Sequence, residues 1–172
     1  NLWVIAGLTI KAFATKSGMR DSGVATVEYS YLPLKTGQTI CYDASTSIAC
    51  PGILDDGSSQ RGSARGYINN GDGTVTDNAT GLVWQRCPLG VSGATCSIGS
   101  QTASTYATGI STCTGLTLAG KTWRLPTYFE LQTLSNFSLI ASDPTFFPNA
   151  SSFYWSSTTA TVLGNNLNAY TI

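Results

Sequence analysis

Five cysteines are the residues of this 172-residue chain whose spacing could support covalent chemistry. Cys41 and Cys50 bracket a short polar loop, and Cys87 and Cys96 bracket another with the same separation. Both spacings predict local disulfides, which persist in oxidising compartments. Because each closes a short loop, we expect each to contribute about 2–3 kcal/mol by restricting the unfolded chain.

Cys113 is the odd cysteine, and in an exported chain an odd cysteine indicates a missing or an intermolecular partner. The chain has no C-x-x-C pair and no histidine, so a zinc site is not expected. A G-x-S-x-G nucleophile elbow is absent, and the cysteines have no histidine to act as a base. We therefore expect no enzyme, no catalytic residue, no metal and no cofactor.

Two acidic turns are candidate calcium-binding loops, namely Asp55-Asp56-Gly57 and the stretch from Asn70 to Asp77. Neither has the spacing of an EF-hand, and the second lacks its bidentate glutamate. Simple turns are favoured at both places, the second leading into a hairpin.

The composition is unusually poor in charge. Nine basic and nine acidic residues cancel, and charged residues make up 10% of the chain against roughly 25% in an average soluble domain. No basic surface is expected, so binding to nucleic acid or to an anionic membrane is disfavoured. A free monomer with so few charges would be prone to self-association. The composition fits either a secreted β-protein with a hydroxyl-rich surface or a protein whose surface is largely covered by other subunits or by glycan.

The first 33 residues read as an extension with two strands. Leu2–Phe13 and Val24–Leu32 are rich in β-formers, a polar segment with two glycines separates them, and Pro33 ends the second. The first run is too short to span a bilayer, so no membrane span is expected. Because the chain opens with Asn1 instead of Met, we expect that a leader has been removed.

Residues 34–172 read as one α+β domain. Strands are predicted at Thr36–Tyr42, Thr74–Asp77, Leu82–Trp84, Ser152–Thr158 and Asn168–Ile172. Dense turn chemistry at residues 69–73 precedes the hairpin formed by the second and third of these.

Two helices are predicted in the same domain. Ala103–Leu118 has weak helical periodicity. Tyr128–Leu139 is the stronger helix because Pro126 lies near its start and it has an apolar stripe, made of Phe129, Leu131, Leu134 and Phe137.

Ordered motifs give the chain from Leu34 onward a family resemblance. They are Lys35-Thr36-Gly37-Gln38-Thr39, Cys41-Tyr42-Asp43, Asp55-Asp56-Gly57, the stretch Asn70–Trp84, Leu118-Ala119-Gly120, Trp123-Arg124-Leu125-Pro126, Glu130-Leu131, Asp143-Pro144, Phe146-Phe147-Pro148 and Tyr154–Thr158. This set resembles the Legionella collagen-like protein C-terminal domain family. The resemblance implies a C-type-lectin-like fold with antiparallel sheets and two helices, an exported protein, and no general catalytic activity.

The chain departs from that family at its end. Members commonly continue after the strand matched by Asn168–Ile172 with two further strands, the last carrying a cysteine that pairs with one on a helix. Cys113 occupies a plausible helix position, and the late cysteine is absent here. The resemblance therefore implies a domain that lacks its last strands and has a groove in their place.

Large side chains within the motifs are expected to build the core. Trp84, Trp123 and Trp155 would anchor it between sheet and helices. Arg124 and Glu130 are expected to pair, either as a partly buried pair that orients the Trp123 loop or as a surface salt bridge contributing about 0–1 kcal/mol.

These observations predict an extracellular structural subunit of a filament or appendage, which polymerises when one identical subunit donates a strand to the next. The expected donor residues are Leu2, Trp3, Val4, Ile5, Leu8, Ile10 and Phe13. The expected acceptor edge is Asn168, Ala169, Tyr170, Thr171 and Ile172.

Three alternatives stay open. The extension could fold back into the groove of its own domain. The domain could instead be a surface-displayed, lectin-like adhesin that binds a glycan or a host protein through an aromatic patch at Tyr154 and Trp155. The sequence could also be an incomplete copy of a longer protein.

Overall fold

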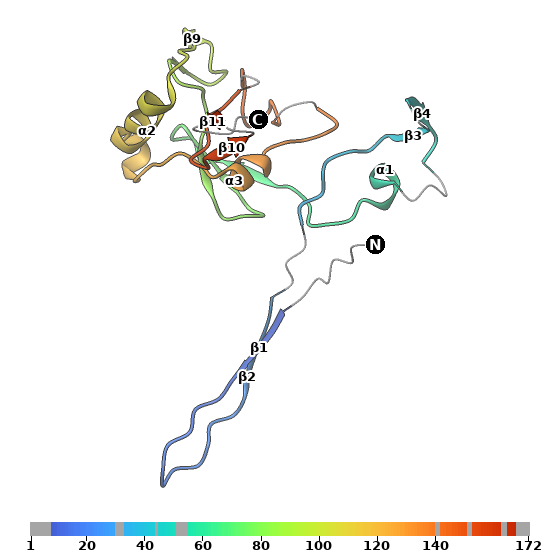
Figure 1. Cartoon of the computed structure of the whole chain (residues 1–172), viewed down its shortest axis with the longest axis vertical. Coiled ribbons are helices and arrows are strands. Elements are labelled where there is room, and N and C mark those ends of the chain that lie inside the picture. The colour runs from blue at the N-terminus through green and yellow to red at the C-terminus, as the bar shows by residue number, and fades with distance from the viewer. Residues whose placement is uncertain are drawn as a thin grey trace.

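The computed structural model describes residues 8–29, 33–43, 45–50, 55–139, 142–150, 153–162 and 165–167. It has two visibly different parts (Figure 1). A long two-stranded hairpin near the N-terminus stands away from a body of short strands and short helices.

The hairpin consists of β1 (Leu8–Ala12) and β2 (Ala25–Tyr29). The strands are antiparallel, with Ile10 opposite Val27. In the loop between them, the N–H of Ser22 donates to the carbonyl of Ala14 over 3.0 Å. Both strands fall within the predicted runs and pair with one another, and residues 2–7 and 30–32 of those runs lie outside the described residues.

A three-stranded antiparallel sheet lies at the centre of the body. Its order is β5 (Tyr67–Asn69), β6 (Thr74–Asp77) and β7 (Val83–Gln85). The β6–β7 hairpin is the one predicted from sequence. Its turn is fixed by the buried carboxylate of Asp77, which accepts hydrogen bonds from the Ala79 N–H at 2.9 Å and the Thr80 hydroxyl at 2.7 Å.

Two smaller hairpins each contain a disulfide. In the first, β3 (Cys41–Asp43) pairs with β4 (Thr46–Ile48); in the second, β8 (Val91–Ser92) pairs with β9 (Ile98–Gly99). The strand predicted over Thr36–Tyr42 is wrong for residues 36–40, which form no strand.

Three α-helices lie among the described residues: α1 (Asp56–Ser59), α2 (Tyr106–Gly115) and α3 (Tyr128–Gln132). A short 3₁₀ turn, η1 (Leu118–Gly120), follows α2. The Thr105 hydroxyl caps α2 by accepting from the Thr108 N–H at 3.3 Å. Helices were predicted at the sites of α2 and α3, and α1 is an additional single turn.

The α3 helix ends at Gln132, so the predicted helix over Tyr128–Leu139 is wrong after that residue. After the helix, the N–H groups of Thr133, Leu134 and Ser135 bond to carbonyls three residues earlier, and the Phe137 N–H bonds to the carbonyl of Thr36 at 3.0 Å. The predicted apolar stripe is not buried as a whole. Leu131 is buried, whereas Phe129 and Phe137 are exposed.

A capping box fixes the start of α3. The Glu130 N–H donates to the Thr127 hydroxyl at 3.2 Å, and the Glu130 carboxylate accepts from the Thr127 N–H at 2.8 Å. Arg124 adds a bidentate pair to the same carboxylate, with N–O distances of 2.6 and 2.8 Å. The Arg124 side chain is 60% exposed and that of Glu130 is 25% exposed, so the pair is closer to a surface salt bridge than to a buried one.

The last described strands, β10 (Ala160–Val162) and β11 (Asn165–Leu167), form one more hairpin. No strand is assigned within the described part of the predicted Ser152–Thr158 run, which has only an isolated bridge at Trp155. The predicted strand Asn168–Ile172 lies outside the described residues.

Few apolar side chains are buried among the described residues. They are Cys41, Val75, Val91, Cys96, Leu131 and Phe147. The fold is therefore α and β with several small antiparallel sheets, and the lectin-like arrangement stays a prediction. In the part that the structure describes, no helix is both long and apolar enough to cross a bilayer.

Replacing Glu130 by glutamine should remove the ion pair with Arg124 and keep an oxygen that can accept the hydrogen bond from the Thr127 N–H. Hydrogen bonds from Arg124, and secondarily from the Thr127 N–H, lower the pKa of Glu130 from 4.5 to about 2. A carboxyl group with a lowered pKa stabilises the fold above its unfolded value, and this contribution is lost as the pH falls through the folded value. A shift of this size corresponds to about 3 kcal/mol, which solvent screening of this exposed pair reduces to about 1 kcal/mol.

We therefore expect Glu130→Gln to lower the free energy of unfolding by about 1 kcal/mol at pH 7. The deficit should shrink between pH 5 and pH 2, as measured by urea unfolding. Asp21→Asn, which neutralises an exposed carboxylate in the β1–β2 loop, is the control and should change little. A deficit that stays constant down to pH 2 would contradict the charge effect.

Candidate functional site

The β1–β2 hairpin is exposed wherever the burial of its residues is described. Every residue from Lys11 to Thr26 is exposed, including the large apolar side chains Phe13, Met19 and Val24. Figure 1 shows the hairpin extending away from the body, with its loop at the far end. A segment that buries so little surface gains little stability from its own fold.

Both outer edges of this hairpin are unpaired in the described structure. β1 and β2 form a two-stranded sheet, and no other described strand joins it. Isolated two-stranded hairpins are marginally stable in water. Unpaired strand edges are templates for adding another strand, so the hairpin is chemically suited to pairing with a further sheet.

The base of the hairpin is held by a parallel bridge between Leu34 and Ser63. The Ser63 N–H donates to the Pro33 carbonyl at 2.8 Å, and the Lys35 N–H donates to the Ser63 carbonyl at 2.9 Å. Gly62 makes this approach possible. It has a φ of +108°, and a Cβ there would lie 2.2 Å from the Pro33 carbonyl oxygen.

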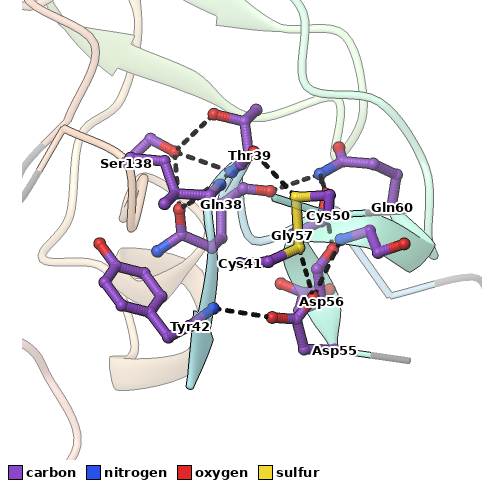
Figure 2. The surroundings of a disulfide bond; sticks show 12 residues. Gln38, Thr39, Cys41, Tyr42, Cys50, Asp55, Asp56, Gly57, Gln60 and Ser138 are labelled. Carbon is purple, nitrogen blue, oxygen red and sulfur yellow. Dashed lines mark hydrogen bonds between the residues drawn. A yellow bond between two sulfur atoms is a disulfide. The ribbon is translucent and has the colours of Figure 1, made fainter. Parts of the chain in front are cut away.

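The segment beyond the bridge is fixed around the Cys41–Cys50 disulfide (Figure 2). The Asp55 carboxylate accepts from the Tyr42 N–H at 3.2 Å and from the Ser58 N–H at 3.1 Å, so it joins β3 to the start of α1. Gly57 packs directly under the strand, because a Cβ there would lie 2.3 Å from the Ile40 carbonyl oxygen.

A junction between residues 36–39 and 136–138 completes this attachment. The Ser138 hydroxyl donates to the Gly37 carbonyl at 2.5 Å and accepts from the Thr39 N–H at 3.1 Å. Figure 2 shows Ser138 beside Thr39 and Gln38, on the same side of the disulfide. The junction joins residues 33–39, which we call the stem of the hairpin, to a part of the chain about a hundred residues away.

The central sheet has two free edges of its own in the described structure. The Asn78 N–H donates to the Gly66 carbonyl, and the Asn70 N–H donates to the Thr74 carbonyl, so the backbone groups of Gly66 and Asn70 face β6. Those of Ile68, midway between them, face β6 as well. Along an antiparallel strand, successive residues direct their N–H and C=O groups to opposite sides, so those of Tyr67 and Asn69 face outward.

The same argument applies to β7 on the other side. Its flanking bonds run from the Asp77 N–H to the Leu82 carbonyl and from the Arg86 N–H to the Gly73 carbonyl. The N–H and C=O groups of Val83 and Gln85 therefore face outward. No described strand pairs with either outer edge of the sheet.

A cavity of about 290 Å³ lies beside β5. It is lined by Arg65, Gly66, Tyr67, Leu134, Asn136, Asp143 and Phe146. The Tyr67 ring lies 5.4 Å from the centroids of both Phe146 and Phe147. Burial raises the pKa of Tyr67, the carboxylates of Asp77 and Asp143 act in the same direction, and the Arg65 guanidinium opposes them.

Of the predicted donor residues, Leu8 and Ile10 lie in β1 and Phe13 is exposed just after it. The others, Leu2, Trp3, Val4 and Ile5, lie outside the described residues. So does the whole predicted acceptor edge, Asn168, Ala169, Tyr170, Thr171 and Ile172.

The cysteines pair as their spacing predicts. Cys41 is bonded to Cys50 and Cys87 to Cys96, with Cα–Cα distances of 5.1 and 5.3 Å. Cys113 is a free thiol on α2, half-buried, and this burial raises its pKa.

The three tryptophans are half-buried. The Trp123 indole N–H donates to the Leu118 carbonyl at 3.0 Å, and that of Trp155 donates to the Ser104 carbonyl at 2.8 Å. The Trp155 ring also packs against Tyr106, at 5.7 Å between centroids. The indole nitrogen of Trp84 is buried and has no hydrogen-bond partner among the described residues.

Sequence reasoning missed the cavity and the free edge of β5. Tyr67, Asp143 and Phe146 are far apart in sequence and belong to no motif of known chemistry. The available signal was the alternation Tyr67-Ile68-Asn69 directly before the dense turn, which marks a strand that pairs with β6. No group of three or more His, Cys, Asp or Glu residues that could hold a metal lies within the described ranges.

Comparison with known proteins gives one family. The sequence model described as the Lcl C-terminal domain matches residues 73–172, which is more than half of the chain. The motifs before residue 73 that carry the resemblance lie outside this match. No curated protein and no solved structure matches the chain.

Substitution of Gly62 tests whether the close approach of the chain at the base of the hairpin stabilises the fold. Gly62→Ala places a Cβ against the backbone of Pro33 and should lower the free energy of unfolding by about 2–4 kcal/mol. Gly81→Ala is the matched control, because Gly81 has a φ of +75° with open space around it, and it should cost only about 1 kcal/mol. Denaturant unfolding measures both, and equal losses would mean that the close approach to Pro33 does not matter.

Proposed function

Because the chain belongs to the Lcl C-terminal domain family, we propose a function for it within that family: an extracellular structural subunit that polymerises by adding strands of one copy to a sheet of the next. The partner is an identical subunit, and the product is a filament or appendage. We propose no enzymatic activity for it.

The observation that carries this proposal is the projecting β1–β2 hairpin. It has two unpaired edges in the described structure and exposes all of residues 11–26. Strand addition supplies main-chain hydrogen bonds to such an edge and side-chain pockets beside it. The donor proposed here is a paired hairpin, in place of the single strand Leu2–Phe13 expected from sequence.

Two bulk properties support assembly. Residues 11–26 and large apolar side chains of the body such as Ile68 and Phe129 are exposed, so a single copy leaves apolar surface available for partners. Only 10% of the residues are charged, which leaves little repulsion between copies. The two disulfides support an extracellular location.

The hairpin geometry favours donation between copies over folding back. β1 and β2 pair with each other and with no other described strand of their own chain. A contact between different surfaces of two copies is heterologous, and it produces an open fibre unless a ring closes.

Recognition of a glycan or host protein is the second candidate function. The cavity beside Tyr67 favours it, because aromatic rings and polar side chains line one concave site. The patch predicted at Tyr154 and Trp155 gives less support, since the Trp155 ring packs on Tyr106 and its N–H is bonded to Ser104.

A double proline variant, Ile10→Pro with Val27→Pro, tests assembly. Ile10 and Val27 are directly opposite, so their N–H groups face either each other's strand or both outer edges. In the first case prolines break the hairpin, and in the second they block addition at both edges. The loss of about two main-chain hydrogen bonds should weaken association ~10–100-fold.

Electron microscopy and light scattering of the full chain would measure this loss. The exchange variant Ile10→Val with Val27→Ile is the control, because it keeps two β-branched residues at the same pair, and it should form polymers like the wild type. If the double proline variant polymerises as the wild type does, strand donation by the hairpin is wrong.

A further inference from the structure

We infer that the outer edge of β5, with the cavity beside Tyr67, is the site that receives a hairpin strand from a second copy. This inference rests on the proposed function and names the surface on which it acts. It also replaces the acceptor expected at residues 168–172, which lies outside the described structure, with one built from described residues.

The first argument is the hydrogen-bonding capacity of the edge. Tyr67 and Asn69 present their backbone N–H and C=O groups outward, and no described strand pairs with them. A strand added here would extend the sheet from three strands to four and would satisfy these groups. Because β6 already pairs with the other side of β5, the edge is preformed.

The second argument is access, which separates the two edges of the sheet. On β5, Asn69 directs its backbone groups outward and is exposed, so an incoming backbone can reach the edge at that residue. On β7, all three residues are half-buried, and the buried indole N–H of Trp84 lies within the strand. The β5 edge is the more open of the two.

The third argument is the cavity. Residues two apart on a strand share a face, so Arg65 and Tyr67 lie on one face of β5 and its extension, and both line the cavity. A strand paired with β5 would place alternate side chains on that same face. A cavity of about 290 Å³ is large enough for one long side chain of the incoming strand.

The lining sets the chemistry of that side chain. Leu134 and Phe146 supply apolar contact, whereas Asn136 and Asp143 supply polar groups. The Asp143 Oδ1 accepts from the Thr145 N–H at 2.9 Å, and its Oδ2 accepts no hydrogen bond from the described residues. The site therefore suits a long side chain with an apolar stem and a donor at its end, a class that includes Lys11 of β1 and Tyr29 of β2.

Proline at the edge is the test. The N–H of Asn69 faces outward, so Asn69→Pro removes a donor needed by an incoming strand and leaves the β5–β6 bonds in place. The matched control is Gln85→Pro, which removes the equivalent outward N–H from β7. We expect Asn69→Pro to reduce polymer formation by the full chain at least ~10-fold, and Gln85→Pro to polymerise like the wild type.

Hydrogen exchange on wild-type chain provides a second measurement that needs no stable variant. The amides of Tyr67 and Asn69 should exchange more slowly in the wild-type polymer than in wild-type chain kept too dilute to assemble, whereas those of Val83 and Gln85 should not change. Unchanged exchange at Tyr67 and Asn69 overturns the inference, as does polymerisation of Asn69→Pro at the wild-type level.

The failures of the two proposals are distinguishable. If the double proline variant is monomeric and Asn69→Pro still polymerises, the hairpin is the donor and β5 is not its acceptor. If the double proline variant polymerises, the proposed function itself fails.

Discussion

Every strand edge in this protein carries backbone N–H and C=O groups that need a hydrogen-bonding partner, and this requirement governs the structure. The described sheets are two or three strands wide, so nearly every strand has an edge without a strand neighbour. In larger domains, sheets are wider and their edges are a smaller share of the whole. Here the edges are a main feature of the molecular surface.

Contacts between residues close in sequence hold several short elements of the body. The disulfides Cys41–Cys50 and Cys87–Cys96 lie at two small hairpins, and the capping box at Thr127 and Glu130 holds a helix of five residues. Such contacts depend on short separations in sequence, and they stabilise elements without a large apolar interior. The body can therefore stay ordered while much of its surface is open for contact.

The success of sequence reasoning follows the range of the interaction involved. The β6–β7 hairpin and the pairing of the cysteines were predictable because the turn at Asp77–Gly81 and the cysteine spacing are local signals. The contact of the Phe137 N–H with the distant Thr36 carbonyl was not, because it forms between residues that meet only after folding. The cavity was hidden for the same reason, since Tyr67 and Asp143 meet only after folding.

The stem of the hairpin also determines how the protein would resist tension. A pull on the hairpin enters the body at Pro33 and first meets the two hydrogen bonds to Ser63. It then meets the bond from the Arg65 guanidinium to the Lys35 carbonyl, at 2.9 Å, and the bonds of Thr36, Gly37 and Thr39 to residues 137 and 138. These weak contacts lie in series along a few residues, and the covalent bond at Cys41 comes after them. Under load, the stem would yield in small steps, and the Cys41–Cys50 disulfide would then pass the force directly to Cys50, so the loop between the two cysteines would not extend.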